Sequence, residues 1–63
     1  MAKWVGRVTF EDGTELEKEY PVRAKTYWQE VEEQYNCECD ILIRAVDTGK
    51  QVDWFSVDYV EED

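Results

Sequence analysis

The first 22 residues carry two alternating segments around a glycine turn, a pattern that specifies a β-hairpin. From Lys3 to Phe10, every second residue is suited to a core, and these positions are Trp4, Gly6, Val8 and Phe10. From Thr14 to Val22, one side is mainly apolar and the other acidic, the latter comprising Glu15, Glu17 and Glu19. The chain therefore begins with two antiparallel strands joined at Glu11-Asp12-Gly13.

The length of the turn sets the register of this hairpin. A two-residue Asp-Gly turn would place Val8 opposite Glu17 and mix core and solvent faces along the ladder. A three-residue loop with Gly13 in the left-handed conformation instead pairs Val8 with Leu16, and also Trp4 with Tyr20 and Arg7 with Glu17. We therefore predict the three-residue loop.

A helix is expected after Pro21, which marks the end of the second strand. Thr26 and Gln29 have the spacing of a capping box, and Asn36 is a plausible left-handed stop, which leaves about ten helical residues. One stripe of this helix is mainly aromatic and is predicted to pack on the sheet: Tyr27, Trp28, Val31 and Tyr35. The glutamates, including Glu30 and Glu33, are predicted to face solvent.

The segment Glu38 to Val46 alternates again and predicts a central strand, followed by a turn and a fourth strand over Gln51 to Tyr59. A turn at Thr48-Gly49 would pair Ile43 with Trp54, Ala45 with Val52 and Arg44 with Asp53. The predicted fold is α+β, with the order β-β-α-β-β. It has one four-stranded, largely antiparallel sheet with a single helix packed on one face. Residues 1–63 form a single domain, with 61–63 as a frayed acidic tail.

The charge of the chain narrows the classes of partner. Sixteen acidic residues against seven basic ones give a formal net charge of −9, which disfavours direct nucleic-acid or membrane binding and favours a basic protein partner. A compact body with rows of carboxylates can imitate a phosphate backbone, as small inhibitors encoded by mobile genetic elements do. We therefore expect a protein-binding module that inhibits or regulates a basic nucleic-acid-binding protein. Its predicted acidic contacts are Glu15, Glu17, Glu19, Glu30 and Glu33.

The apolar residues exceed what one covered sheet face needs. With the helix on the face of Ile41 and Ile43, the opposite face would expose four apolar side chains: Leu42, Val46, Phe55 and Val57. Exposed patches of this kind mark interaction surfaces. The alternative function is therefore a structural or assembly protein that forms a homodimer or complex through this face. A strongly curled sheet would instead bury both sets.

The sequence offers little for catalysis. It contains no histidine, and Ser56 has no histidine to activate it, so we expect neither an enzyme nor a cofactor. Cys37 and Cys39 would point the same way on a strand, but zinc usually needs four ligands, so a metal or redox role is the least supported alternative. These two thiols and the lack of a long apolar run lead us to expect a cytoplasmic protein.

Overall fold

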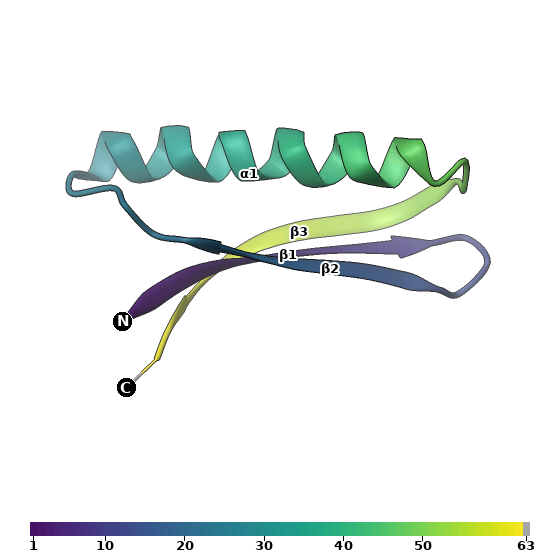
Figure 1. Ribbon diagram of the computed structural model, residues 1–63, viewed down its shortest axis with the longest axis horizontal. Coiled ribbons are helices and arrows are strands. Elements are labelled where there is room, and N and C mark those ends of the chain that lie inside the picture. The colour runs from purple at the N-terminus through teal and green to yellow at the C-terminus, as the bar shows by residue number, and fades with distance from the viewer. Residues whose placement is uncertain (63) are drawn as a thin grey trace.

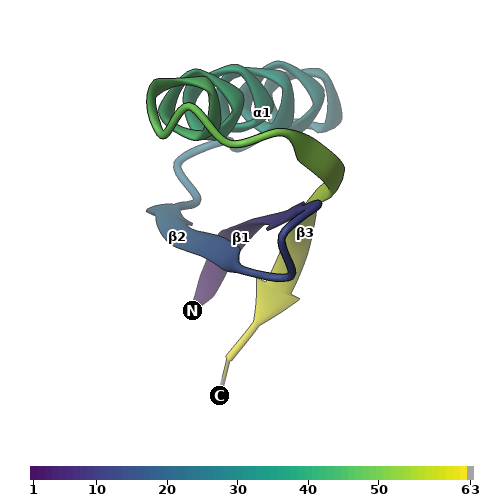
Figure 2. The same cartoon turned by 90° about the vertical axis from the view of Figure 1, so that its right-hand side faces the viewer.

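The computed structural model describes residues 1–62, which form three antiparallel strands and one helix (Figure 1). In chain order these are β1 (Ala2–Phe10), β2 (Glu15–Pro21), α1 (Tyr27–Asp47) and β3 (Val52–Glu61). The strands are ordered β2-β1-β3, and α1 covers one face of the sheet (Figure 2). The α+β class and the single helix on one face are confirmed. The four-stranded sheet is wrong, because the described part of the chain forms three strands.

The first hairpin has the predicted register. Val8 lies opposite Leu16, Trp4 opposite Tyr20 and Arg7 opposite Glu17. Gly13 has a φ of 89°, which a side chain would disfavour, and the Phe10 amide donates to the Thr14 carbonyl across the loop at 2.9 Å. The three-residue loop therefore keeps the apolar side of each strand on the helix-covered face.

The predicted strand over Glu38 to Val46 is the second half of α1, and Asn36 does not end the helix. Cys37, Ile41 and Ala45 recur every four residues and are all buried, so this segment has a helical apolar face as well as an alternating pattern. A ten-residue helix would span about 15 Å, half the length of β1, whereas 21 residues at ~1.5 Å cover the strand fully. The predicted pairs of Ile43, Ala45 and Arg44 with β3 are accordingly wrong.

The two ends of α1 are fixed by local signals. The Thr26 hydroxyl accepts from the Gln29 amide, as predicted, while the Gln29 side chain accepts from the Lys25 amide at 2.8 Å. At the other end, Gly49 has a φ of 76° and its amide donates to the Val46 carbonyl. Gly49 is therefore the left-handed residue at which the helix stops.

The helix packs on the sheet with a different face from the predicted one. Tyr27, Trp28 and Tyr35 are 68%, 76% and 64% exposed, so the aromatic stripe lies outside the core. The core consists of Trp4, Val8, Phe10, Cys37, Ile41, Ala45 and Val57. At Gly6 an added Cβ would lie 2.7 Å from Ile41 Cδ1, so this glycine lets the helix approach β1 closely.

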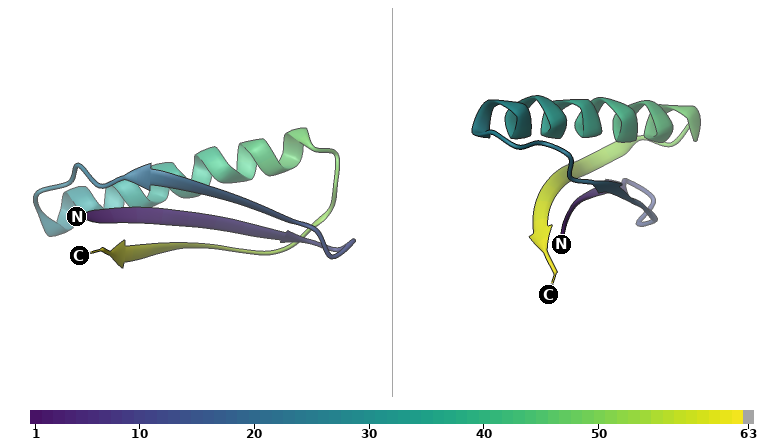
Figure 3. Two further views of the ribbon diagram at one scale, coloured as in Figure 1. Left: turned by 60° about the horizontal axis from the view of Figure 1, so that its bottom comes forward. Right: turned by 60° about the vertical axis from the view of Figure 1, so that its left-hand side comes forward.

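The sheet extends to both ends of the described chain, which lie side by side (Figure 3). β3 pairs with β1 from Ala2 opposite Glu61 to Phe10 opposite Val52, with a bulge near Thr9. Met1 and Glu62 exchange backbone hydrogen bonds of 2.7 and 2.6 Å. Of the acidic tail predicted for 61–63, Glu61 thus ends β3, Glu62 is held by its backbone bonds to Met1, and residue 63 lies outside the described residues.

Candidate functional site

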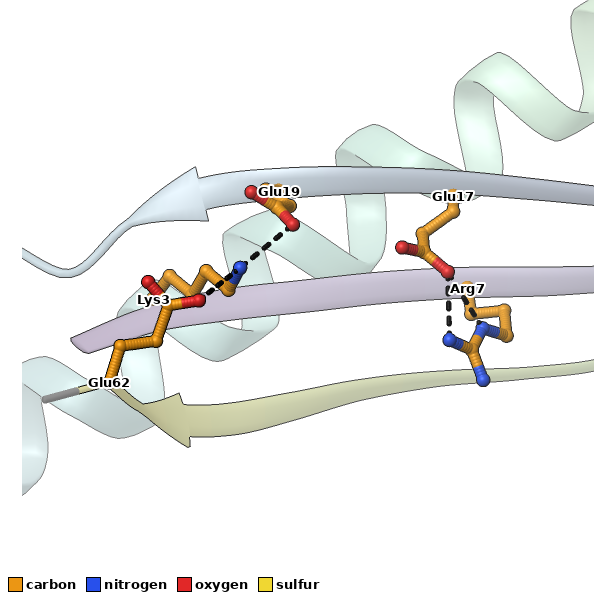
Figure 4. Close-up of polar contacts among 5 residues, drawn as sticks. All are labelled: Lys3, Arg7, Glu17, Glu19 and Glu62. Carbon is orange, nitrogen blue, oxygen red and sulfur yellow. Dashed lines mark hydrogen bonds and ion pairs between the residues drawn. The ribbon is translucent and has the colours of Figure 1, made fainter.

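The predicted acidic contacts lie on two different surfaces. Glu15, Glu17 and Glu19 are exposed on β2, on the sheet face without a helix, which we call the open face. There, Lys3 pairs with Glu19 and Glu62 at 2.9 and 2.6 Å, and Arg7 donates to Glu17 at 2.8 and 3.0 Å (Figure 4). Glu30 and Glu33 lie on α1. The structure therefore does not bring the five carboxylates together in one row.

The cations of β1 partly neutralise the open face. The hydrogen bonds that Lys3 donates, first to Glu62 and then to Glu19, raise the pKa of its ammonium, and the bond from Lys3 lowers the pKa of Glu62. Two members of the β2 row thus already have a cationic partner. Glu15 has no ion pair within the described chain, although carboxylates still outnumber cations on this face.

Glu33 has a structural position that the sequence analysis missed. Its carboxylate accepts a 2.7 Å bond from the indole of buried Trp4 and bonds from the amides of Arg23 and Ala24. Partial burial raises the pKa of Glu33, but these hydrogen bonds outweigh it and hold the pKa below its ordinary value. Glu33 therefore fixes the connection between β2 and α1.

The carboxylate of Asp40 makes a hydrogen-bonded contact between the helix and β2. It accepts a 2.6 Å bond from the Tyr20 hydroxyl and a 2.9 Å bond from Arg44, with Lys18 at 4.0 Å. The bonds from Tyr20 and Arg44 lower the pKa of Asp40. The i, i+4 spacing of Asp40 and Arg44 is a helical signal that could have identified this contact.

The four predicted apolar contacts also have different environments. Leu42 is half-buried and Val46 is 70% exposed, both on α1, while Phe55 on β3 is 38% exposed. Val57 is 6% exposed and belongs to the core, so its predicted exposure is wrong. The reason is that Val57 faces the helix, opposite Gly6, where the missing side chain leaves room for close packing.

Exposed apolar side chains nevertheless gather where the helix meets β3, among the carboxylates of Glu30, Glu38 and Asp58. Gln34 donates a 2.9 Å bond to the Val57 carbonyl, and Val31 lines a groove with Val57 and Tyr59, which identifies this side of the helix. Helical spacing extends the stripe along α1 toward Val46. We call this surface the β3 side; its residues are Val31, Tyr35, Leu42 and Val46 of α1 with Phe55 and Tyr59 of β3. Val31 and Tyr35 belong to the aromatic stripe predicted from the sequence, but its predicted place in the core is wrong.

The cysteines do not form a paired site. Cys37 is buried in the core and burial raises the pKa of its thiol, whereas Cys39, two residues along the helix, points elsewhere. In residues 1–62 no group of three or more potential ligands is placed to hold a metal ion. The same residues include no helix with the length and apolar character needed to cross a membrane.

Comparison of the chain with protein-family models, curated proteins and solved structures gives no match.

Proposed function

We propose that this chain is a non-enzymatic protein-binding module that contacts its partner through the β3 side. The observation that carries the proposal is the clustering of exposed apolar side chains beside one strand. Val31, Tyr35 and Val46 are 43%, 64% and 70% exposed on the helix, and Phe55 and Tyr59 continue the surface on β3. Clusters of exposed apolar side chains rimmed by polar residues mark contact sites. Both cysteines are free thiols, which suits action in the cytoplasm.

Site-specific photo-crosslinking in cells tests this proposal. A benzophenone amino acid replaces Val46 in one variant and Glu15, on the open face, in another. We expect protein adducts from position 46 and far fewer from position 15, because only the first lies in the contact. A lack of adducts at position 46, with the variant folded, would refute the β3 side as a binding surface.

The open face favours a second candidate, a basic protein partner whose groove normally holds nucleic acid. Its support is the surplus of Glu15, Glu17, Glu19, Asp58 and Glu62 over Lys3 and Arg7. Such a complex would weaken steeply as salt increases. Replacing Glu15, Glu17 and Glu19 by Gln should release that partner in a salt-graded pull-down. Unchanged retention would remove the nucleic-acid-mimic hypothesis.

A further inference from the structure

The outer edge of β3 has free backbone groups at known positions. Met1 and Glu62 exchange both hydrogen bonds, and such pairs alternate with non-bonded pairs along an antiparallel ladder. Counting from this pair, Ser56 bonds to β1, whereas Phe55, Val57 and Tyr59 direct their amides and carbonyls outward. No strand covers these groups within the described chain. The Val57 carbonyl already accepts from Gln34, and its second lone pair remains available.

The helix restricts what can occupy this edge. A bare peptide strand would satisfy the backbone of β3 but leave the apolar stripe of α1 exposed. A partner that covers both the β3 backbone and the apolar stripe of α1 needs its own strand edge and an apolar helix on the same face of its sheet. This chain itself has both features. Because α1 packs on β1 and β3 more than on β2, two copies related by a two-fold axis would place their helices about 10 Å apart, a normal packing distance.

We infer that a second copy of this chain occupies the β3 side, forming a homodimer with a continuous six-stranded sheet and paired helices. This inference rests on the proposed function and specifies its partner. The two β3 strands run antiparallel, and both helices lie on the same face of the sheet.

Charge and length select the register. A two-fold axis perpendicular to the sheet places one β3 residue opposite the same residue of the second copy, and the choice of that residue defines the register. Centred on Ser56, it places Trp54 opposite Asp58 and Phe55 opposite Val57, and no carboxylate faces another between residues 53 and 59. An axis at Val57 would place Asp53 opposite Glu61, and an axis at Asp58 would place two copies of Asp58 opposite each other, so both registers bring carboxylates together. An axis at Phe55 would leave fewer paired residues.

The available area is sufficient for a dimer. β3 and α1 together form a broad side of the molecule, which faces away from the viewer in Figure 1, and the Cα extents in that projection are 37 × 23 Å. Covering two thirds of that side buries about 570 Å² on each copy, or roughly 1,100 Å² in total, near the lower limit for stable complexes. Two bodies of charge −9 also repel, so we expect a dimer of about micromolar affinity that tightens as salt increases.

A disulfide trap tests the register directly. In the full chain with Cys37→Ala and Cys39→Ala, Ser56→Cys places two thiols on a non-hydrogen-bonded pair, where Cα atoms lie about 4.5 Å apart and a disulfide fits. The matched control is Asp58→Cys, whose two copies would lie about 13 Å apart along the strands. We expect rapid covalent dimers from position 56 and at least about tenfold slower formation from position 58. Equal rates would overturn the register.

Sedimentation equilibrium of the unmodified chain at low and high salt tests the dimer itself. A dimer that strengthens with salt supports the inference, and a monomer at about 100 µM in both conditions refutes it. If the chain is monomeric while position 46 crosslinks to another protein, the homodimer fails but the proposed function stands. If position 46 gives no adduct at all, the proposed function fails with it.

Discussion

The two edges of the sheet differ in how they are protected. β2 is seven residues long and ends at Pro21. Its glutamate side chains lie on the open face, and Lys18 lies on the face covered by the helix. These are devices that prevent a sheet from pairing with another chain. β3 is ten residues long, contains neither proline nor lysine, and presents Trp54, Phe55 and Tyr59. This difference, although β3 also carries Asp53, Asp58 and a bulge, is the basis for proposing a partner at β3 rather than at β2.

The contacts of the helix show the same asymmetry. On the side of α1 nearer β2, hydrogen-bonded carboxylates hold the helix: Glu33 accepts from Trp4 of β1, and Asp40 accepts from Tyr20 of β2. Toward β3, α1 presents apolar side chains, and Gln34 makes the hydrogen bond to the strand. One side of the helix is therefore completed within the chain, while the other leaves apolar area that a partner can cover.

The largest effect is expected from removing the side chains that protect the β2 edge. The triple variant Glu17→Thr, Lys18→Val, Glu19→Thr should convert a dimer into larger assemblies, because both edges can then pair and the contact no longer closes. Sedimentation velocity measures the size distribution. The control Glu11→Thr, Lys25→Val, Glu32→Thr makes the same charge change away from β2 and should leave the dimer intact. An unchanged dimer in the first variant would contradict the protective role of β2.

A matched pair of helix variants separates the β3 side from the rest of α1. Val46→Glu places a charge in the proposed contact twice per dimer and should raise the dissociation constant about 100-fold. Asn36→Glu adds the same charge at an exposed residue on the β2 side of the helix, where Asn36 lines a groove with Tyr20 and Arg23. Its effect should stay within about threefold. Equal effects, measured by sedimentation equilibrium, would show that net charge rather than position matters.

Acid should loosen the β2 side of the helix selectively. Glu33→Ala leaves the buried Trp4 indole without its acceptor and should cost about 1–2 kcal/mol in the free energy of unfolding at pH 7. Because the pKa of Glu33 is lowered on folding, its contribution is complete above the ordinary value of 4.5 and is lost as pH falls through the lowered value. Urea unfolding at several pH values should show the variant and the natural chain converging in acid. A constant difference would contradict this role.

The smallest expected effect is on the open face. Replacing Glu15, Glu17 and Glu19 by Gln should change the free energy of unfolding by less than about 1 kcal/mol, because exposed ion pairs contribute little. The same variant should dimerise slightly more tightly, since each copy carries less negative charge. Urea unfolding and sedimentation check both results. A large loss of stability would show that the pairs with Lys3 and Arg7 hold the sheet together.

The sequence was sufficient to predict the hairpin and the start of the helix, because their signals are local. Gly13 sets the loop and the register, and Thr26 caps the first turn. The second half of the chain was not predictable in this way. Ile41 and Ala45 fit both an alternating strand pattern and a four-residue helical pattern, and the fit of a long helix over the strands decides between them.

The site was harder to predict than the fold because it depends on which face of the helix turns inward. Glu33 faces the sheet because Trp4 and two amides satisfy its carboxylate, while Tyr35 turns outward. That preference depends on partners distant in the sequence. Gly49 was a local stop signal, but Asn36 offered an earlier one.

Amide hydrogen exchange at increasing protein concentration compares the two edges most directly. On β3 the outward amides belong to Phe55, Val57 and Tyr59; on β2, by the same alternation, they belong to Glu15, Glu17 and Glu19. We predict that exchange at the β3 amides slows as concentration rises, while the β2 amides exchange rapidly throughout. Equally rapid exchange at both edges at every concentration would contradict an occupied β3 side.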